Sequence, residues 1–121
     1  MEKLSGRPDE KGKDRMAWLL LLLAGLFEVV WAYSMKLSEG FTRLGPSVIT
    51  IIFMILSVVL LSISMRTLPL GTAYTVWTGI GAIGSFLLGI FILNEPAGAM
   101  RMLAAVLIVS GLVLMKLSSS N

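Results

Sequence analysis

Hydrophobic positions in this chain form four long runs that are separated by short polar stretches. The runs extend from about Ala17 to Met35, Pro46 to Met65, Gly71 to Leu93 and Ala99 to Leu117. About 20 apolar residues in helical conformation cross the hydrocarbon core of a bilayer. The pattern therefore predicts an all-α membrane protein with four transmembrane helices. Connections as short as these make neighbouring helices antiparallel.

The overall composition agrees with the membrane class. Of the 121 residues, 56% are hydrophobic and 14% are charged, and the mean hydropathy is +0.89. A soluble domain has about 25% charged residues, so this chain lacks the polar groups that would cover a water-exposed surface. The isoelectric point of about 9.6 does not indicate a nucleic-acid partner, because the basic residues form no stripe.

The chain contains no Cys and no His. Disulfides, thiol nucleophiles and imidazole acid–base chemistry are therefore excluded. A zinc site is not expected, and neither is another metal or a cofactor. With no nucleophile–base pair in the sequence, an enzyme is the least favoured class of protein.

Residues 1–15 are polar and carry charges of both signs, with Gly6, Pro8 and Gly12 among them. A segment of this composition cannot bury a core, so we expect it to be disordered. Met16 stands directly before the first apolar run and resembles a second start. We therefore favour an added leader over a native extension for residues 1–15, and we expect residues 16–121 to form the four-helix membrane domain.

Positive charges are nearly balanced between the two sides of the predicted domain. Arg66 and Lys116 lie on the side of the termini, whereas Lys36, Arg43 and Arg101 lie on the other. Because an excess of Lys and Arg marks the cytoplasmic side, this balance favours neither orientation. The five basic residues of the tail would break the balance.

Glu28 is an acidic residue midway along the first apolar run. An ionised carboxylate at that depth costs about 3 kcal/mol on insertion scales. No Lys or Arg lies at membrane depth in any run, so an internal ion pair has no partner. A permanently protonated structural acid is the alternative to a functional one. We favour a carboxylate that faces a cavity and exchanges a proton for a cation.

Small and aromatic residues surround Glu28 on its own helix. Trp31 follows it by three residues and lies on the same helical face, and Gly25 precedes it by three. The glycine leaves space beside the carboxylate. A Trp near a membrane boundary is often an interfacial anchor, but Trp31 is deeper, and we favour a role in the site.

Three further side chains are candidates for the same site. Tyr74 and Trp77 share a face of the third helix and can line a cation site through cation–π contact. A helix-packing stripe explains these two rings equally well. Ser57 is a hydroxyl near the middle of the second run, where bonding to its own helix backbone is the usual case.

Small residues mark two places for close helix approach. Gly79, Gly81 and Gly84 in the third run allow either tight packing or a kink, and composition does not separate the two. Ser110 and Gly111 interrupt the otherwise aliphatic fourth run. Their size suits helix–helix contact.

Taken together, Met16 to about Ser118 resembles the small multidrug resistance family of proton-coupled transporters. The resemblance rests on Glu28, on Lys36–Leu44 (KLSEGFTRL) with Pro46 and Ser47 after it, and on Gly71–Tyr74 (GTAY) through Trp77. Within the family, the chain is most similar to the guanidinium exporter subtype. That similarity is carried by Glu28–Ala32 (EVVWA), Trp77–Ala82 (WTGIGA) and, more weakly, Met100-Arg101.

The resemblance implies an antiparallel homodimer of two identical chains inserted in opposite orientations in the bacterial inner membrane. The balanced charges fit this arrangement independently. The resemblance also implies that the fourth helices, which contain Ser110 and Gly111, form the dimer contact. Protons and guanidinium would compete for the two copies of Glu28. The implied substrate and proton site comprises Glu28, Trp31, Ser57, Tyr74 and Trp77. Ser57 would hydrogen-bond near the carboxylate, and Tyr74 would relay or gate access.

Guanidinium suits a site of this kind. It is planar and presents parallel N–H donors to carboxylate oxygens, and aromatic rings can hold such a weakly hydrated plane. Two alternatives stay open. One is a proton-coupled exporter of quaternary ammonium cations, which have no N–H donors. The other is a non-transporting membrane subunit, such as half of a heterodimer.

Overall fold

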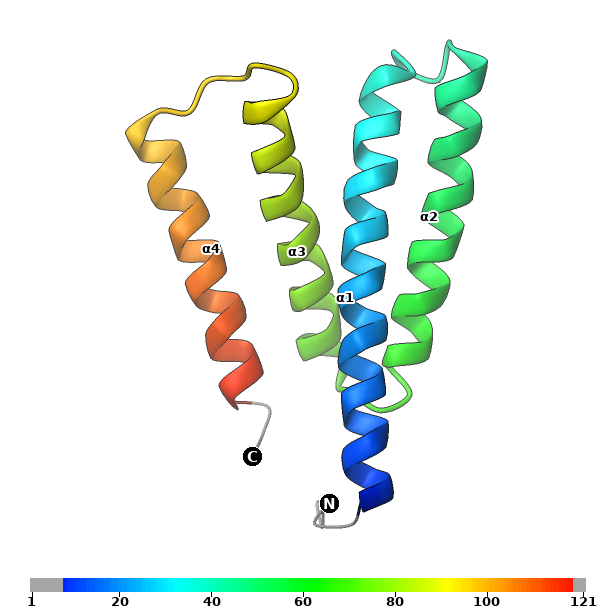
Figure 1. Ribbon diagram of the computed structural model, residues 1–121, viewed down its shortest axis with the longest axis vertical. Helices are drawn as coiled ribbons and strands as arrows, with labels where there is room; N and C mark the ends of the chain where they lie inside the picture. The colour runs from blue at the N-terminus through cyan, green and yellow to red at the C-terminus, as the bar shows by residue number, and fades with distance from the viewer. Residues whose placement is uncertain (1–7, 119–121) are drawn as a thin grey trace.

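The computed structural model describes residues 8–118, with side chains from residue 11, and this part of the chain forms four helices (Figure 1). They are α1 (Pro8–Leu37), α2 (Leu44–Ser64), α3 (Leu70–Phe91) and α4 (Ala99–Ser118). Each is long and apolar enough to cross a membrane. The predictions of an all-α chain and of four membrane-spanning segments are thus confirmed.

The N-terminal boundary differs from the sequence prediction. We expected disorder through residue 15, but α1 begins at Pro8, so residues 8–15 continue the helix. Adding residues to an existing helix requires no new nucleus, and Pro is well suited to a first helical position. Residues 8–15 of the predicted tail are thus helical in the structure. The rest of the predicted tail, residues 1–7, lies outside the described residues.

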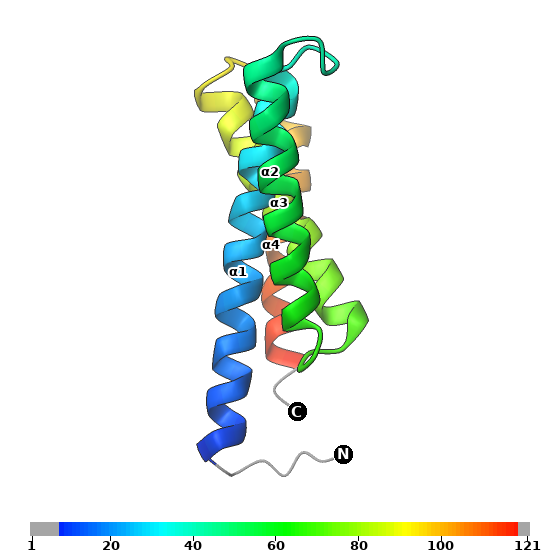
Figure 2. The same ribbon diagram turned by 90° about the vertical axis from the view of Figure 1, so that its right-hand side faces the viewer.

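The helices are arranged around α1. It packs lengthwise against α2 and also against α3, while α4 lies beside α3, on the side away from α2 (Figures 1 and 2). The buried apolar residues come from α1, α2, α3 and the loop before α3: Ala17, Leu21, Ala24, Leu61, Leu68, Ala73 and Val76. None of the residues of α4 is buried. In a bilayer, exposed apolar side chains of this kind face lipid, so close packing between helices depends on small residues.

Glycines set the distance between α1 and α3. A Cβ atom added at Gly25 would lie 2.6 Å from Cγ2 and 2.7 Å from Cβ of Ile80. On α3, a Cβ at Gly84 would overlap the side chain of Val29. Gly79 lies on the other side of α3, where a Cβ would overlap Leu112 of α4. These glycines allow close helix approach, and α3 continues as one helix through them.

Ser38 organises the turn after α1. Its hydroxyl donates to the carbonyl of Met35 at 2.7 Å and accepts from the N–H of Phe41 at 3.0 Å. The backbone then turns through left-handed conformations at Glu39, Gly40 and Phe41. Only glycine adopts that conformation without strain, so the bonds of the buried Ser38 side chain help to hold the other two residues. The turn fixes the end of α1 next to the start of α2.

Replacing Gly25 by Ala should destabilise the fold. Overpacking against the branched side chain of Ile80 costs about 1–3 kcal/mol, more than the roughly 1 kcal/mol that Ala gains over Gly as a helix former. Thermal unfolding in detergent, followed by circular dichroism, measures the effect. Gly71→Ala is the matched control, because a Cβ at Gly71 meets nothing within 4 Å. Equal stability of the two variants would contradict the packing argument.

Candidate functional site

Glu28 points from α1 toward α3. Its carboxyl group lies directly against the backbone of Gly81, where an added Cβ would overlap it. One carboxyl oxygen, Oε1, is buried and has no hydrogen-bond partner among the described residues. A buried polar atom left without a partner costs about 1–3 kcal/mol. The structure thus holds an acceptor that a proton or a cation could satisfy.

Trp31 carries a second unsatisfied polar atom. It lies on the same face of α1, about one turn beyond Glu28, and its Nε1 is buried without a hydrogen-bond partner in the described part of the chain. One face of α1 therefore holds an unpartnered acceptor and an unpartnered donor. Native proteins satisfy nearly all such buried groups, so two together mark a place for a ligand, a water or another chain.

Ser57 joins three helices. It is completely buried; its hydroxyl donates to the carbonyl of Ala24 on α1 at 2.7 Å and accepts from Trp77 Nε1 on α3 at 2.9 Å. In a regular helix, the carbonyl of residue 24 also accepts the N–H of residue 28. Ser57 therefore bonds the turn of α1 that carries Glu28. It does not make the usual bond to its own helix.

The two aromatic residues of α3 point in different directions. Trp77 reaches Ser57 on α2, whereas Tyr74 is 52% exposed and lines a cleft of about 640 Å³ between α3 and α4. Their ring centroids are 5.5 Å apart, with planes inclined by 48°. No hydrogen bond between Tyr74 and Glu28 is present in residues 8–118. Within one chain, Ser57 and Trp77 are joined by a hydrogen bond and Tyr74 contacts the ring of Trp77. The network reaches α1 at the carbonyl of Ala24, one turn before Glu28.

The candidate dimer-contact residues lie apart from this cluster. The Ser110 hydroxyl is exposed and donates to the carbonyl of Val106 in its own helix at 2.8 Å. A Cβ added at Gly111 would meet nothing within 4 Å. The single chain thus leaves open space at the middle of α4.

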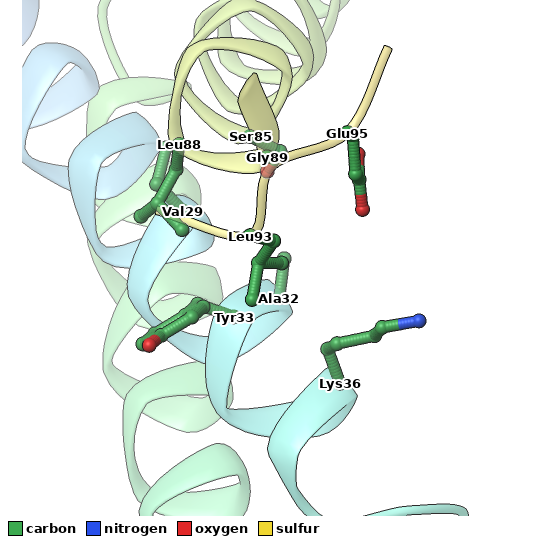
Figure 3. A pocket seen from close by; sticks show the side chains of 9 residues that line it. All are labelled: Val29, Ala32, Tyr33, Lys36, Ser85, Leu88, Gly89, Leu93 and Glu95. Atoms are coloured by element: carbon green, nitrogen blue, oxygen red, sulfur yellow. The ribbon is translucent and has the colours of Figure 1, made fainter. Parts of the chain in front are cut away.

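A second pocket, which the sequence analysis did not single out, lies farther along the α1–α3 interface (Figure 3). It has a volume of about 180 Å³ and is lined by Val29, Ala32, Tyr33, Lys36, Ser85, Leu88, Gly89, Leu93 and Glu95. The sequence shows Lys36 and Glu95 only as charges in separate loops, nearly 60 residues apart. The sequence does contain one indication that these charges are close. Lys36 and Glu95 both follow apolar runs that end on the same side of the membrane.

The titratable side chains show no metal centre. No group of three or more His, Cys, Asp or Glu residues within the described range could hold a metal ion. The site therefore offers one carboxylate, a hydroxyl and aromatic rings. These groups can bind a proton or an organic cation.

Comparison with known proteins gives consistent matches. The family model described as Small Multidrug Resistance protein matches residues 16–119. A protein of Citrobacter freundii named "Guanidinium exporter" is 57% identical over 104 residues, which cover 86% of this chain and 99% of the relative. Proteins with the same name from Salmonella typhimurium and Yersinia pseudotuberculosis are 54% and 53% identical over equal lengths.

Replacing Ser57 by Ala should destabilise the helix bundle. The change leaves the partly buried Trp77 Nε1 without its acceptor, which costs about 1–3 kcal/mol where the atom is shielded from water. Thermal unfolding in detergent measures the loss, and tryptophan fluorescence should report the altered surroundings of Trp77. Ser110→Ala is the control, because that exposed hydroxyl bonds only its own helix. If Ser57→Ala is as stable as the control, the hydrogen bonds of Ser57 do not stabilise the bundle.

Proposed function

Because the chain belongs to the small multidrug resistance family, we propose that it exports guanidinium ion in exchange for protons. It is a multi-pass protein of the bacterial inner membrane, and as a member of this family it is a transporter, not an enzyme. The relatives named guanidinium exporters support the choice of substrate. The observation that carries the proposal is the unsatisfied carboxyl oxygen of Glu28.

The chemistry of Glu28 suits an exchange reaction. The carboxyl lies between two apolar helices, and no Lys or Arg lies at its depth in the four runs to neutralise it. A charged carboxylate is costly at this depth, so the group is stable there when it holds either a proton or a cation. Binding one then requires release of the other, and this competition couples the two flows.

The surroundings of Glu28 favour a small cation with N–H donors. Guanidinium can donate two parallel hydrogen bonds to one carboxylate, which would satisfy Oε1. Gly81 leaves no side chain between the carboxyl and the α3 backbone. The network of Ser57 and Trp77 holds the turn of α1 in position, and positioned aromatic rings can stack on the flat ion.

The proposed assembly is an antiparallel homodimer in which the α4 helices meet. Three observations support it. No residue of α4 is buried in the single chain, Gly111 leaves room for a close neighbour, and Lys and Arg are nearly balanced between the two membrane sides over residues 16–118. In this dimer, two copies of Glu28 would share protons and substrate.

A second candidate substrate class is quaternary ammonium. The cleft of about 640 Å³ between α3 and α4 favours it, because Tyr74 and apolar side chains such as Leu112 and Met115 could surround a bulky cation. Such a cation has no N–H group and would leave Oε1 of Glu28 without a hydrogen bond. Competition between guanidinium and a tetraalkylammonium ion for the purified protein would separate the two classes.

Replacing Glu28 by Gln should abolish proton-coupled guanidinium transport and leave the fold intact. The amide keeps the shape of the carboxyl but can neither release a proton nor neutralise a cation. Proteoliposomes with a proton gradient measure guanidinium flux and the accompanying pH change. Glu39→Gln, an exposed acid outside the membrane runs, should transport as the parent does. Full activity of Glu28→Gln would refute the assigned role.

Cysteine cross-linking should distinguish antiparallel from parallel α4 pairs. The chain has no native Cys, and Met100 and Leu117 lie near opposite ends of α4, about 26 Å apart along a helix. In an antiparallel pair, Met100→Cys on one copy should cross-link to Leu117→Cys on the other. Each variant alone should give little cross-linked dimer. Efficient cross-linking of either variant to itself would indicate parallel helices instead.

A further inference from the structure

The pocket in Figure 3 lies at the end of the α1–α3 interface where both helices end. Apolar side chains, among them Ala32 and Leu88, form much of its wall. Lys36 reaches its opening from α1, and Glu95 reaches it from the segment after α3 (Figure 3). The pocket thus combines an apolar interior with one charge of each sign at the opening.

The same helix interface leads from this pocket to Glu28. Val29 lines the pocket and packs against Gly84 on α3. The neighbouring residue on α1, Glu28, packs against Gly81, about one turn earlier on α3. The contact between Val29 and Gly84 therefore separates the pocket from the carboxyl of Glu28. A small separation of α1 and α3 at that contact would join the two.

The position of Glu95 is fixed by the backbone at the end of α3. Its N–H donates to the carbonyl of Gly89 at 2.9 Å, and its carboxyl lies over Gly89, where an added Cβ would overlap it. The preceding Asn94 has a φ of 58°, a left-handed conformation that allows this reversal of the chain. The sequence thus brings a carboxylate back onto the last turns of α3.

This position favours a cation. The last carbonyls of a helix carry partial negative charge, so a carboxylate beside them is repelled unless a positive charge lies between. Within residues 11–118, the ion pair found is between Arg43 and Glu39, and Glu95 has none. Lys36 stands at the same opening without forming an ion pair with it.

From these contacts we infer that Glu95 and the end of α3 form a second, weaker guanidinium site, through which the ion passes between water and Glu28. The inference rests on the proposed function. Guanidinium has enough N–H donors to bond a carboxylate and backbone carbonyls together. The ammonium of Lys36 repels the bound ion and competes with it for Glu95. Weak binding suits a transit site, since an ion must leave it as readily as it enters.

Transport kinetics test this site through opposite effects of its two charges. Replacing Glu95 by Gln should raise the KM for guanidinium about two- to five-fold, the range of a solvent-exposed ion pair, with an unchanged maximal rate. Glu95→Asp should recover most of the affinity. Lys36→Gln should lower the KM, because it removes the competing cation. Glu39→Gln removes an acid from the same side of the membrane and should change neither value.

Two kinetic results would overturn the inference. An equal rise of KM in Glu39→Gln would show that the net surface charge acts, not the pocket. A fall in maximal rate with an unchanged KM in Glu95→Gln would show a structural role for this side chain.

A binding measurement separates this site from the function proposed for Glu28. In the Glu28→Gln background, guanidinium chloride should shift the amide NMR signals of Gly89 and Glu95, and tetramethylammonium chloride should shift them far less. Adding Glu95→Gln should abolish the guanidinium shift. If the parent protein does not transport guanidinium but the shifts are present, the proposed function fails and the site stands. If transport occurs and these amides do not respond, the site fails alone.

Discussion

The structure depends on the close approach of α1 and α3. Glycines on both helices allow it, with Gly25 under Ile80, Gly81 under Glu28 and Gly84 under Val29. Apolar side chains gain little from contact with one another in lipid, so tight backbone approach of this kind supplies much of the association between membrane helices. The same approach places the Glu28 carboxyl against bare backbone. One packing feature thus accounts for both the close contact of α1 with α3 and the burial of the Glu28 carboxyl beside a backbone that offers it no side chain.

The hydrogen bonds of Ser57 fix the positions of α1, α2 and α3 relative to one another. Two of the three groups involved, the serine hydroxyl and the indole N–H of Trp77, would be costly if left alone in an apolar interior. They satisfy each other and leave the hydroxyl hydrogen for the carbonyl of Ala24. Ser57 and Trp77 therefore have their hydrogen bonds satisfied within the bundle. The polar atoms that stay unsatisfied, on Glu28 and Trp31, lie on the adjacent part of α1.

Much of this arrangement could be predicted from the sequence, because it depends on patterns within single helices. Apolar runs near 20 residues gave the four helices, and spacing along α1 placed Glu28 and Trp31 on one face. Contacts between helices could not be predicted in the same way. The partner of Ser57 is a backbone carbonyl 33 residues away, and no residue type marks it. The pocket at Glu95 depends on a left-handed Asn94 after α3, which composition does not reveal. The helical start at Pro8 also escaped prediction, since charge composition describes an isolated segment and not one that continues a formed helix.

Two features of the single chain lack a partner: the carboxyl of Glu28 and the outer face of α4. Oε1 of Glu28 accepts no hydrogen bond, so it needs a proton or a cation as its partner. The helix α4 contributes no buried residue and packs its backbone against α3 alone, which leaves a full helix face for lipid or for another chain. An acid shared by two copies would make one copy's occupancy depend on the other's, since two nearby carboxylates resist being charged together. Binding of a cation to such a pair would displace a proton from it, so assembly through α4 and exchange at Glu28 would be parts of the same mechanism.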